Sequence, residues 1–153
     1  MFLSESLVLE NKKFVLKEKK ENRNRDVVST PNEIVKYMVK KSLKPLCEGK
    51  SPKEILNLKI ADIACGSGVF LLEAFDFLIQ YCKNWYENSD KKHLIVGQDG
   101  KRKLSFKDKK EILNSCIYGV DIYPNAVEVA KFSLYLKLLE DETKPSLNNK
   151  KQL

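Results

Sequence analysis

An apolar run that ends in a glycine-rich turn and leads directly into an apolar helix constrains the fold of this chain more than any other feature. Residues 58–63 (LKIADI) predict a buried strand, which stops at the turn 64–68 (ACGSG). A helix is predicted to begin near Val69 and is apolar on most sides. A second strand is predicted over 116–122, and Pro124 opens another helix behind it. This alternation is typical of an α/β fold, a partial parallel sheet with right-handed crossovers and helices on both faces.

The amino-terminal part of the chain carries weaker signals. Alternating apolar and charged residues within Ser6–Lys20 predict a strand. Farther on, Thr30 can accept a hydrogen bond from the amide three residues later, Pro31 suits the first helical position, and Glu33 can close a capping box. A helix is therefore predicted from this point, and Pro45 is expected to end it.

Between the two strand–helix units the sequence turns polar, and we treat 87–115 as an insertion. The Asp-Gly pair at 99–100 predicts a turn between short strands at 94–96 and 104–106. Residues 107–114 predict a short helix. The insertion therefore contains a hairpin and a helix of its own.

The length of 153 residues, 42% of them hydrophobic, is that of one globular domain, which can hold a core without disulfides or a structural metal. We divide the chain into an amino-terminal extension (1–25), a main part (26–140) and a polar tail (141–153). No apolar run approaches the ~18 residues that a bilayer span needs, and residues 1–13 are too charged for a signal peptide. We therefore expect a cytoplasmic protein without a membrane partner.

The formal net charge of +7 arises from 28 Lys and Arg against 21 Asp and Glu. A basic balance suits a polyanionic partner, because each neutralised phosphate releases counterions. A surface rich in solvated lysines explains the same charge equally well. The same two interpretations hold for Lys101–Lys103 and Lys107–Lys110, which can touch a DNA backbone or simply face water.

The cysteines contain no Cys-x-x-Cys pair, and His93 is the one histidine. This spacing disfavours both a zinc site and a disulfide framework. We expect no metal, a surface position for His93, and reduced, mostly buried thiols at Cys47, Cys65, Cys82 and Cys116.

Ligands of parallel sheets bind at the carboxyl ends of the strands, which here carry Asp62 and Asp121. The turn has two of the three glycines of a dinucleotide motif, with Leu71 at the third position, and Asp62 would repel a pyrophosphate. S-adenosylmethionine fits better, because Asp62 can face its ammonium group and Asp121 can accept both ribose hydroxyls. A turn-forming Asp62 and a helix-capping Asp121 are the structural alternatives.

Three segments resemble motifs of the N6-adenine DNA methyltransferases. Residues 62–71 (DIACGSGVFL) resemble the first cofactor motif, D-P-A-C-G-S-G-x-F-L. Residues 117–122 and the helix at 126–131 resemble the second motif, and residues 29–31 (STP) resemble the upstream motif, usually Y-T-P. Ile63 stands where the family usually has Pro, and Ser29 replaces the usual Tyr.

The resemblance spans Arg23 to Leu139 and is closest to the large type IIG-like restriction-modification enzymes that join cleavage and methylation in one chain. It implies a Rossmann-like S-adenosylmethionine-dependent methyltransferase fold, in which Asp121 takes the ribose and Ile122 packs on adenine. The upstream motif would lie over the methionine end. The cofactor-binding residues implied are Thr30, Pro31, Asp62, Ala64, Cys65, Gly66, Ser67, Gly68, Asp121 and Ile122.

The family's catalytic motif [DN]-P-P-[YF] does not occur in these 153 residues, whose five prolines are all isolated. We therefore assign no catalytic residue and interpret the chain as a fragment that lacks the catalytic and target-recognition regions and meets DNA through the full-length enzyme. We also expect self-association through open sheet edges, or capping of an edge by the amino-terminal segment. Alternatives are a methyltransferase of protein glutamine or RNA, and a non-catalytic nucleotide-binding or interaction module.

Overall fold

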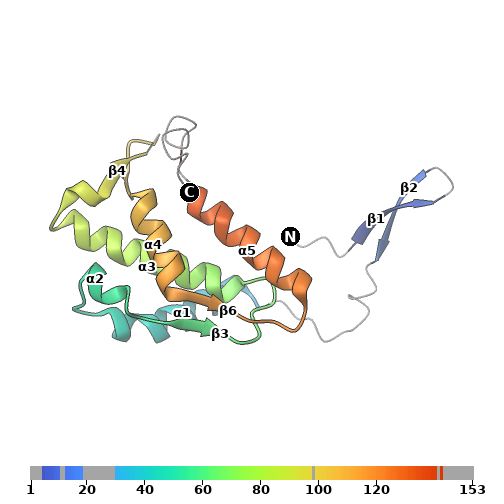
Figure 1. Ribbon diagram of the computed structural model, residues 1–153, viewed down its shortest axis with the longest axis horizontal. Coiled ribbons are helices and arrows are strands. Elements are labelled where there is room, and N and C mark those ends of the chain that lie inside the picture. Colours follow the sequence, from blue (N-terminus) through green and yellow to red (C-terminus); the bar gives the residue numbers. More distant parts are fainter. Residues whose placement is uncertain (1–4, 11–12, 19–29, 98, 141, 143–153) are drawn as a thin grey trace. The chain divides into compact units, whose positions relative to one another are not determined.

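The computed structural model describes residues 5–10, 13–18, 30–97, 99–140 and 142 (Figure 1). The chain divides into two compact units, residues 1–31 and residues 32–153. About half of the extension predicted for residues 1–25 and nearly all of the predicted polar tail (141–153) lie outside the described residues.

The first unit contains a β-hairpin. Strand β1 (Glu5–Glu10) pairs antiparallel with strand β2 (Lys13–Glu18), with Leu7 opposite Leu16. The single strand predicted within Ser6–Lys20 is therefore wrong in number, because the alternating pattern forms two strands that pair with each other. Pairing supplies each strand with partners for its backbone N–H and C=O groups.

The second unit is built on a short parallel sheet. Strand β3 (Ile60–Asp62) pairs in parallel with β6 (Ile117–Gly119) and is followed by helix α3 (Val69–Glu87), while β6 leads into α5 (Pro124–Leu139). The predicted parallel order of strand, helix, strand and helix is confirmed, and with it an α/β fold. Both strands are shorter than the sequence predicted.

Helices cover one face of this sheet. Helix α3 returns along β3 and β6 (Figure 1), and Leu71 lies against Gly119, where an added Cβ would meet its Cδ1 at 2.6 Å. On the opposite face Ala61 is exposed, and its register partner Tyr118 is 44% exposed. The expectation of helices on both faces is therefore wrong for the described part of the chain, since nothing there covers the second face.

Helix α1 (Asn32–Cys47) buries one narrow stripe against α3. The stripe consists of residues spaced four apart, namely Val35, Val39, Leu43 and Cys47. Pro45 does not end the helix as predicted, because it lies in the last turn, where few backbone hydrogen bonds remain to be lost, and burial of Cys47 holds that turn in place. The Thr30–Glu33 capping box is not found among the hydrogen bonds of the described residues.

A short helix, α2 (Pro52–Ile55), follows α1 and begins with a capping box. The Glu54 carboxylate accepts hydrogen bonds from the Ser51 amide at 2.8 Å and from the Ser51 hydroxyl at 2.6 Å. Ile55 is fully buried, so this turn places an apolar side chain in the core immediately before β3.

The polar insertion contains a 3₁₀ turn, η2 (Lys91–His93), the antiparallel strands β4 (Leu94–Val96) and β5 (Arg102–Leu104), and helix α4 (Phe106–Cys116). The hairpin is confirmed, but its second strand lies two residues earlier than predicted. Ser105 causes this shift, because its hydroxyl accepts a hydrogen bond from the Asp108 amide and starts α4 there.

His93 is not the surface loop residue that the sequence predicted. Its ring stacks on Tyr86 with centroids 4.1 Å apart, and its Nδ1 lies 3.0 Å from Asp108 Oδ1. The Asp108 carboxylate also accepts a hydrogen bond from the Ser105 hydroxyl. These contacts tie the insertion to α3 and α4.

All four cysteines are buried and free, as predicted for reduced thiols. Burial raises the pKa of Cys82 to about 12 and that of Cys116 to about 11, so both thiols are neutral packing groups. The described residues contain no group of three ligand side chains that could hold a metal ion. Within that same part of the chain, no helix is both long and apolar enough to cross a membrane.

Lys109 is the one buried charged residue in the core of the described chain. It is 3% exposed, and its Nζ donates to the Glu140 carbonyl at 2.7 Å and lies 3.7 Å from Glu142 Oε1. This contact joins α4 to the carboxyl end of α5. Lys109 is therefore not available to a DNA backbone. The sequence had allowed such a contact for the whole run Lys107–Lys110.

Replacing Lys109 by Ala should lower the free energy of unfolding by about 3–5 kcal/mol, because the Glu142 carboxylate loses its buried partner. The matched control is Lys107→Ala, which removes an exposed lysine from the same helix and should change stability by less than about 0.5 kcal/mol. Urea unfolding followed by circular dichroism measures both. Equal effects of the two substitutions would contradict a structural role for Lys109.

Candidate functional site

The two strand exits predicted to hold a ligand lie side by side. Beyond the ends of β3 and β6, the Val120 amide donates to the Asp62 carbonyl at 2.9 Å, and the Cys65 amide donates to the Val120 carbonyl at 3.0 Å. These bonds continue the parallel pairing into the loops. The residues that follow each strand are therefore held at one edge of the sheet, as parallel strands require.

The glycine-rich turn depends on two residues with positive φ. Gly66 has φ +51° and Gly68 has φ +81°, a conformation that other residues adopt only with strain. Gly68 also touches α5, because an added Cβ would lie 2.8 Å from the Cβ of Ala130. At Gly66 an added Cβ would meet nothing within 4 Å, so the turn is open to solvent on that side.

The amino end of α3 lies at this turn and has no side-chain cap. Gly68 is the N-cap residue, and the first turn contains no acidic side chain. The N–H groups of a first helical turn have no partner within the helix, and the helix dipole adds partial positive charge there. This end of α3 can therefore receive a carboxylate from a ligand.

Asp121 links the two strand exits through its carboxylate. Oδ1 accepts a hydrogen bond from the Tyr123 amide at 2.9 Å, and Oδ2 accepts one from the Gly66 amide at 2.7 Å. These bonds, led by that from Tyr123, lower the pKa of Asp121, so the group is ionised at neutral pH. The contact with Tyr123, the N-cap residue of α5, matches the helix-capping role that was the structural alternative for Asp121. Each carboxylate oxygen can still accept a further hydrogen bond from a ligand.

Asp62 combines a turn contact with a free oxygen. Its Oδ1 accepts a hydrogen bond from the Ala64 amide at 3.1 Å, which is the turn-forming role weighed as the alternative. Its Oδ2 has no hydrogen-bond partner within the described part of the chain. One carboxylate oxygen thus remains for a cationic ligand group.

Cys65 lies beneath the turn and is 7% exposed. Burial raises the pKa of its thiol, and the charges of Asp121 and Asp62 add to this effect, so the thiol stays protonated. It packs near Gly119, where an added Cβ would lie 3.2 Å from its Sγ. Sequence reasoning missed Gly119, although a glycine two residues before a strand-end acid is a signal of close packing.

Ile122 projects from the second exit and is 85% exposed. Ala64 is also exposed, and Ser67 is half-buried between the two glycines of the turn. Thr30 and Pro31 belong to the first unit, in which Thr30 is half-buried and Pro31 is exposed. The second unit thus brings eight of the ten residues predicted for cofactor binding to one edge of its sheet.

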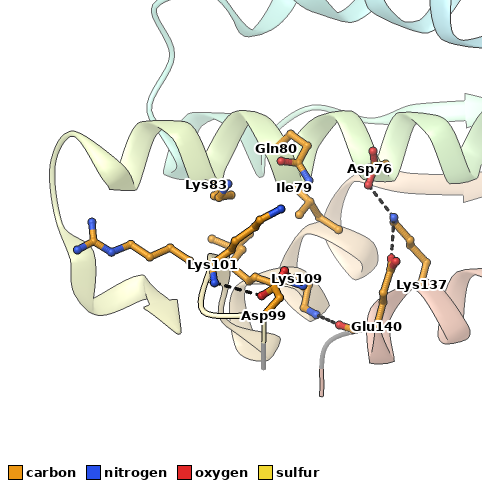
Figure 2. Close-up of a pocket in the computed structure, with 12 residues that line it drawn as sticks. Asp76, Ile79, Gln80, Lys83, Asp99, Lys101, Lys109, Lys137 and Glu140 are labelled. Atoms are coloured by element: carbon orange, nitrogen blue, oxygen red, sulfur yellow. Dashed lines mark hydrogen bonds and ion pairs between the residues drawn. The ribbon is translucent and has the colours of Figure 1, made fainter. Parts of the chain in front are cut away.

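A cavity of about 280 Å³ lies elsewhere in the second unit (Figure 2). Its walls include Asp76, Ile79, Gln80 and Lys83 of α3 and Lys137 of α5. The glycine-rich turn and Asp121 come directly before the amino ends of α3 and α5, whereas the residues that line the cavity lie farther along both helices. The cavity is therefore separate from the edge that carries Asp62 and Asp121.

Comparison with known proteins identifies the family. Residues 12–151 match the model of the N-6 DNA Methylase family. The chain belongs to this family. The matched range includes the glycine-rich turn, Asp62 and Asp121.

Two relatives are restriction-modification proteins. Over 144 residues the chain is 45% identical to an Escherichia coli protein named "Type II restriction enzyme and methyltransferase RM.Eco57I", covering 94% of this chain and 14% of the relative. Over 88 residues it is 36% identical to a Methanocaldococcus jannaschii protein named "Putative type II restriction enzyme and methyltransferase RM.MjaORFECS2P", covering 58% of this chain and 7% of the relative. The chain thus spans a small part of the length of these relatives.

Replacing Gly68 by Ala should destabilise the protein more than replacing Gly49 by Ala. Both glycines have positive φ, at +81° and +76°, so both substitutions incur a backbone strain of about 1–2 kcal/mol. At Gly49 an added Cβ meets nothing, whereas at Gly68 it overlaps Ala130, which should add about 1–3 kcal/mol. Urea unfolding measures the difference, and equal losses would show that the turn and α5 are not in close contact.

The stabilising effect of Asp121 should disappear in acid. Its pKa in the folded protein lies below the unfolded value of about 3.9, so its contribution is present above that pH and is lost as the pH falls through the folded pKa. The stability difference between the wild type and Asp121→Asn should therefore shrink as the pH falls below about 4. Urea unfolding at pH 7 and pH 3 tests this, and a difference independent of pH would contradict it.

Proposed function

We propose that this chain is the S-adenosylmethionine-binding portion of an N6-adenine DNA methyltransferase that belongs to a bacterial restriction-modification system. The observation that carries the proposal is the placement of two ionisable acids and an uncapped helix end at one edge of a parallel sheet, in a member of the N-6 DNA Methylase family. Restriction-modification activity in the named relatives supports the same biological context.

Asp121 and Ile122 suit the adenosine end of the cofactor. The ionised Asp121 carboxylate has acceptor capacity beyond its two backbone bonds and would accept the ribose hydroxyls. The exposed side chain of Ile122 offers an apolar surface on which the adenine ring would pack.

Asp62 and the amino end of α3 suit the methionine end. The free Oδ2 of Asp62 would accept hydrogen bonds from the ammonium group, while the uncapped N–H groups of α3 would hold the carboxylate. Gly66 leaves open space at the turn, and Ala64, Ser67 and the other turn residues would line it. Thr30 and Pro31 remain proposed cofactor residues because they resemble the upstream motif of the family.

The cofactor supplies an electrophilic methyl group when it is bound. The residues of this chain would bind and orient the donor, whereas holding an adenine and its amine requires groups such as those of [DN]-P-P-[YF], which these residues lack. We therefore propose that the 153 residues alone do not methylate DNA, and that DNA binds through the full-length cytoplasmic enzyme. Self-association through the sheet edges is part of the same proposal.

Thermal unfolding with S-adenosylmethionine tests the proposal. At 100 times the Kd, the ligand should stabilise the chain by about 2.7 kcal/mol, and roughly 5–10 °C in Tm follows for a domain of this size. Asp121→Asn should weaken binding by about tenfold or more, because it removes a charged hydrogen-bond acceptor. Glu128→Gln, a surface change on α5, is the matched control and should bind as the wild type does.

The dinucleotide NAD serves as the competing ligand in this experiment. Stabilisation by NAD with no effect of S-adenosylmethionine would overturn the assignment of the cofactor. Equal binding of S-adenosylmethionine by Asp121→Asn and the wild type would overturn the assigned role of Asp121.

A further inference from the structure

The stretch 83–110, which overlaps most of the polar insertion, is one of the basic segments of the chain. Residues 83–110 contain nine Lys and Arg against four Asp and Glu, an excess of five in a chain of net charge +7. They form the last turn of α3, η2, the β4–β5 hairpin and the first turns of α4. Because like charges repel one another, such an excess is unfavourable for the isolated fold and suits an anionic partner.

The cavity opens within this basic part of the molecule. Figure 2 shows Gln80 and Lys83 on α3 along one wall, with Lys101 on the hairpin along the other. The cavity has a volume of about 280 Å³. Its charged lining consists of Lys83, Lys101, Arg102, Lys103, Lys109 and Lys137, together with Asp76, Asp99 and Glu140.

Some of these cations hold the walls together. Lys137 Nζ lies 2.8 Å from Asp76 and 2.7 Å from Glu140, so it joins α5 to α3. Lys103 Nζ lies 3.4 Å from Asp99 within the hairpin. Each of these three acids is therefore engaged with a lysine, and Asp99 also accepts a hydrogen bond from the Lys101 backbone amide at 3.1 Å.

Lys101 and Arg102 are in a different situation. Both are exposed, and neither forms an ion pair with any residue of the described ranges. Lys83, on the facing wall, forms an ion pair with Glu87 at 3.6 Å. Lys107, in the first turn of α4, is exposed as well.

We propose that Lys101 and Arg102, with Lys83 on the facing wall, bind phosphate groups of a nucleic-acid backbone. Exposed Lys and Arg side chains make most phosphate contacts in such complexes, and a guanidinium can grip two phosphate oxygens at once. The excess of five positive charges in residues 83–110 is more than one small anion would neutralise. The choice of DNA as the nucleic acid rests on the proposed function.

The position of the surface decides what it can contact. Lys83 is fifteen residues beyond Gly68, which corresponds to about 22 Å along α3 at 1.5 Å per residue. The surface therefore lies away from the cofactor edge and would hold duplex outside the base that reacts. It contributes to DNA affinity and leaves binding of the methyl donor unchanged.

Fluorescence anisotropy with a labelled 20-base-pair DNA duplex, titrated with the 153-residue chain at several salt concentrations, tests this proposal. The double variant Lys101→Glu/Arg102→Glu is compared with Lys36→Glu/Lys40→Glu, which makes the same charge change on the exposed side of α1. Loss of two phosphate contacts should reduce the slope of log K against log salt by about 1.8 and weaken binding at 0.1 M salt by roughly tenfold or more. The α1 variant should bind DNA as the wild type does, apart from a smaller loss common to any added negative charge.

Two results would overturn the proposal. Equal losses in the two variants would mean that only net charge matters, and displacement of the duplex by millimolar inorganic phosphate at constant ionic strength would mean a small-anion site. Thermal shift with S-adenosylmethionine, run on the same samples, distinguishes failure of the DNA-binding proposal from failure of the proposed function. The hairpin variant should keep the full shift of the wild type, and a reduced shift would contradict a surface remote from the cofactor edge.

Discussion

The hydrogen bond from the Gly66 amide to the Asp121 carboxylate joins two loops that are 55 residues apart in the chain. It extends the backbone pairing of β3 and β6, which continues through Val120 beyond the ends of both strands. Since Gly66 belongs to the turn that starts α3, the same bond fixes the amino end of that helix relative to the second strand exit. Every residue of the second unit that we propose for cofactor binding depends on this arrangement.

Helix α3 separates two regions of opposite charge. Its amino end lies at the edge that carries Asp62 and Asp121, and its carboxyl end lies in the basic insertion. One face of the helix is packed against α1, and the helix also contacts the sheet, α4 and α5. A core helix of this length keeps the proposed site for a cationic methyl donor apart from the proposed surface for a polyanion.

Apolar surface remains uncovered on the second unit. Tyr118 and Val120 are 44% and 62% exposed on the open side of the sheet, and Phe132 and Leu136 are 63% and 54% exposed on α5. Side chains of this size usually lie within a core or an interface. The uncovered side is consistent with the proposal that further protein contacts this unit in the complete enzyme.

The sequence by itself determined the order of strand, glycine turn and helix, and it identified Asp62, the turn and Asp121 as the edge of interest. Local rules suffice there, because a glycine pair can be read as a turn and a carboxylate after an apolar run as a strand exit. They failed at Pro45 and at Cys116, where burial against other elements extended α1 and α4 beyond their predicted ends. They also failed at His93 and Lys109, whose partners lie 15 and more than 30 residues away. Only the tertiary structure decided that the Asp121 carboxylate accepts a hydrogen bond from the Gly66 amide and that Leu71 and Cys65 pack against Gly119. Both depend on contacts between segments that are distant in the chain.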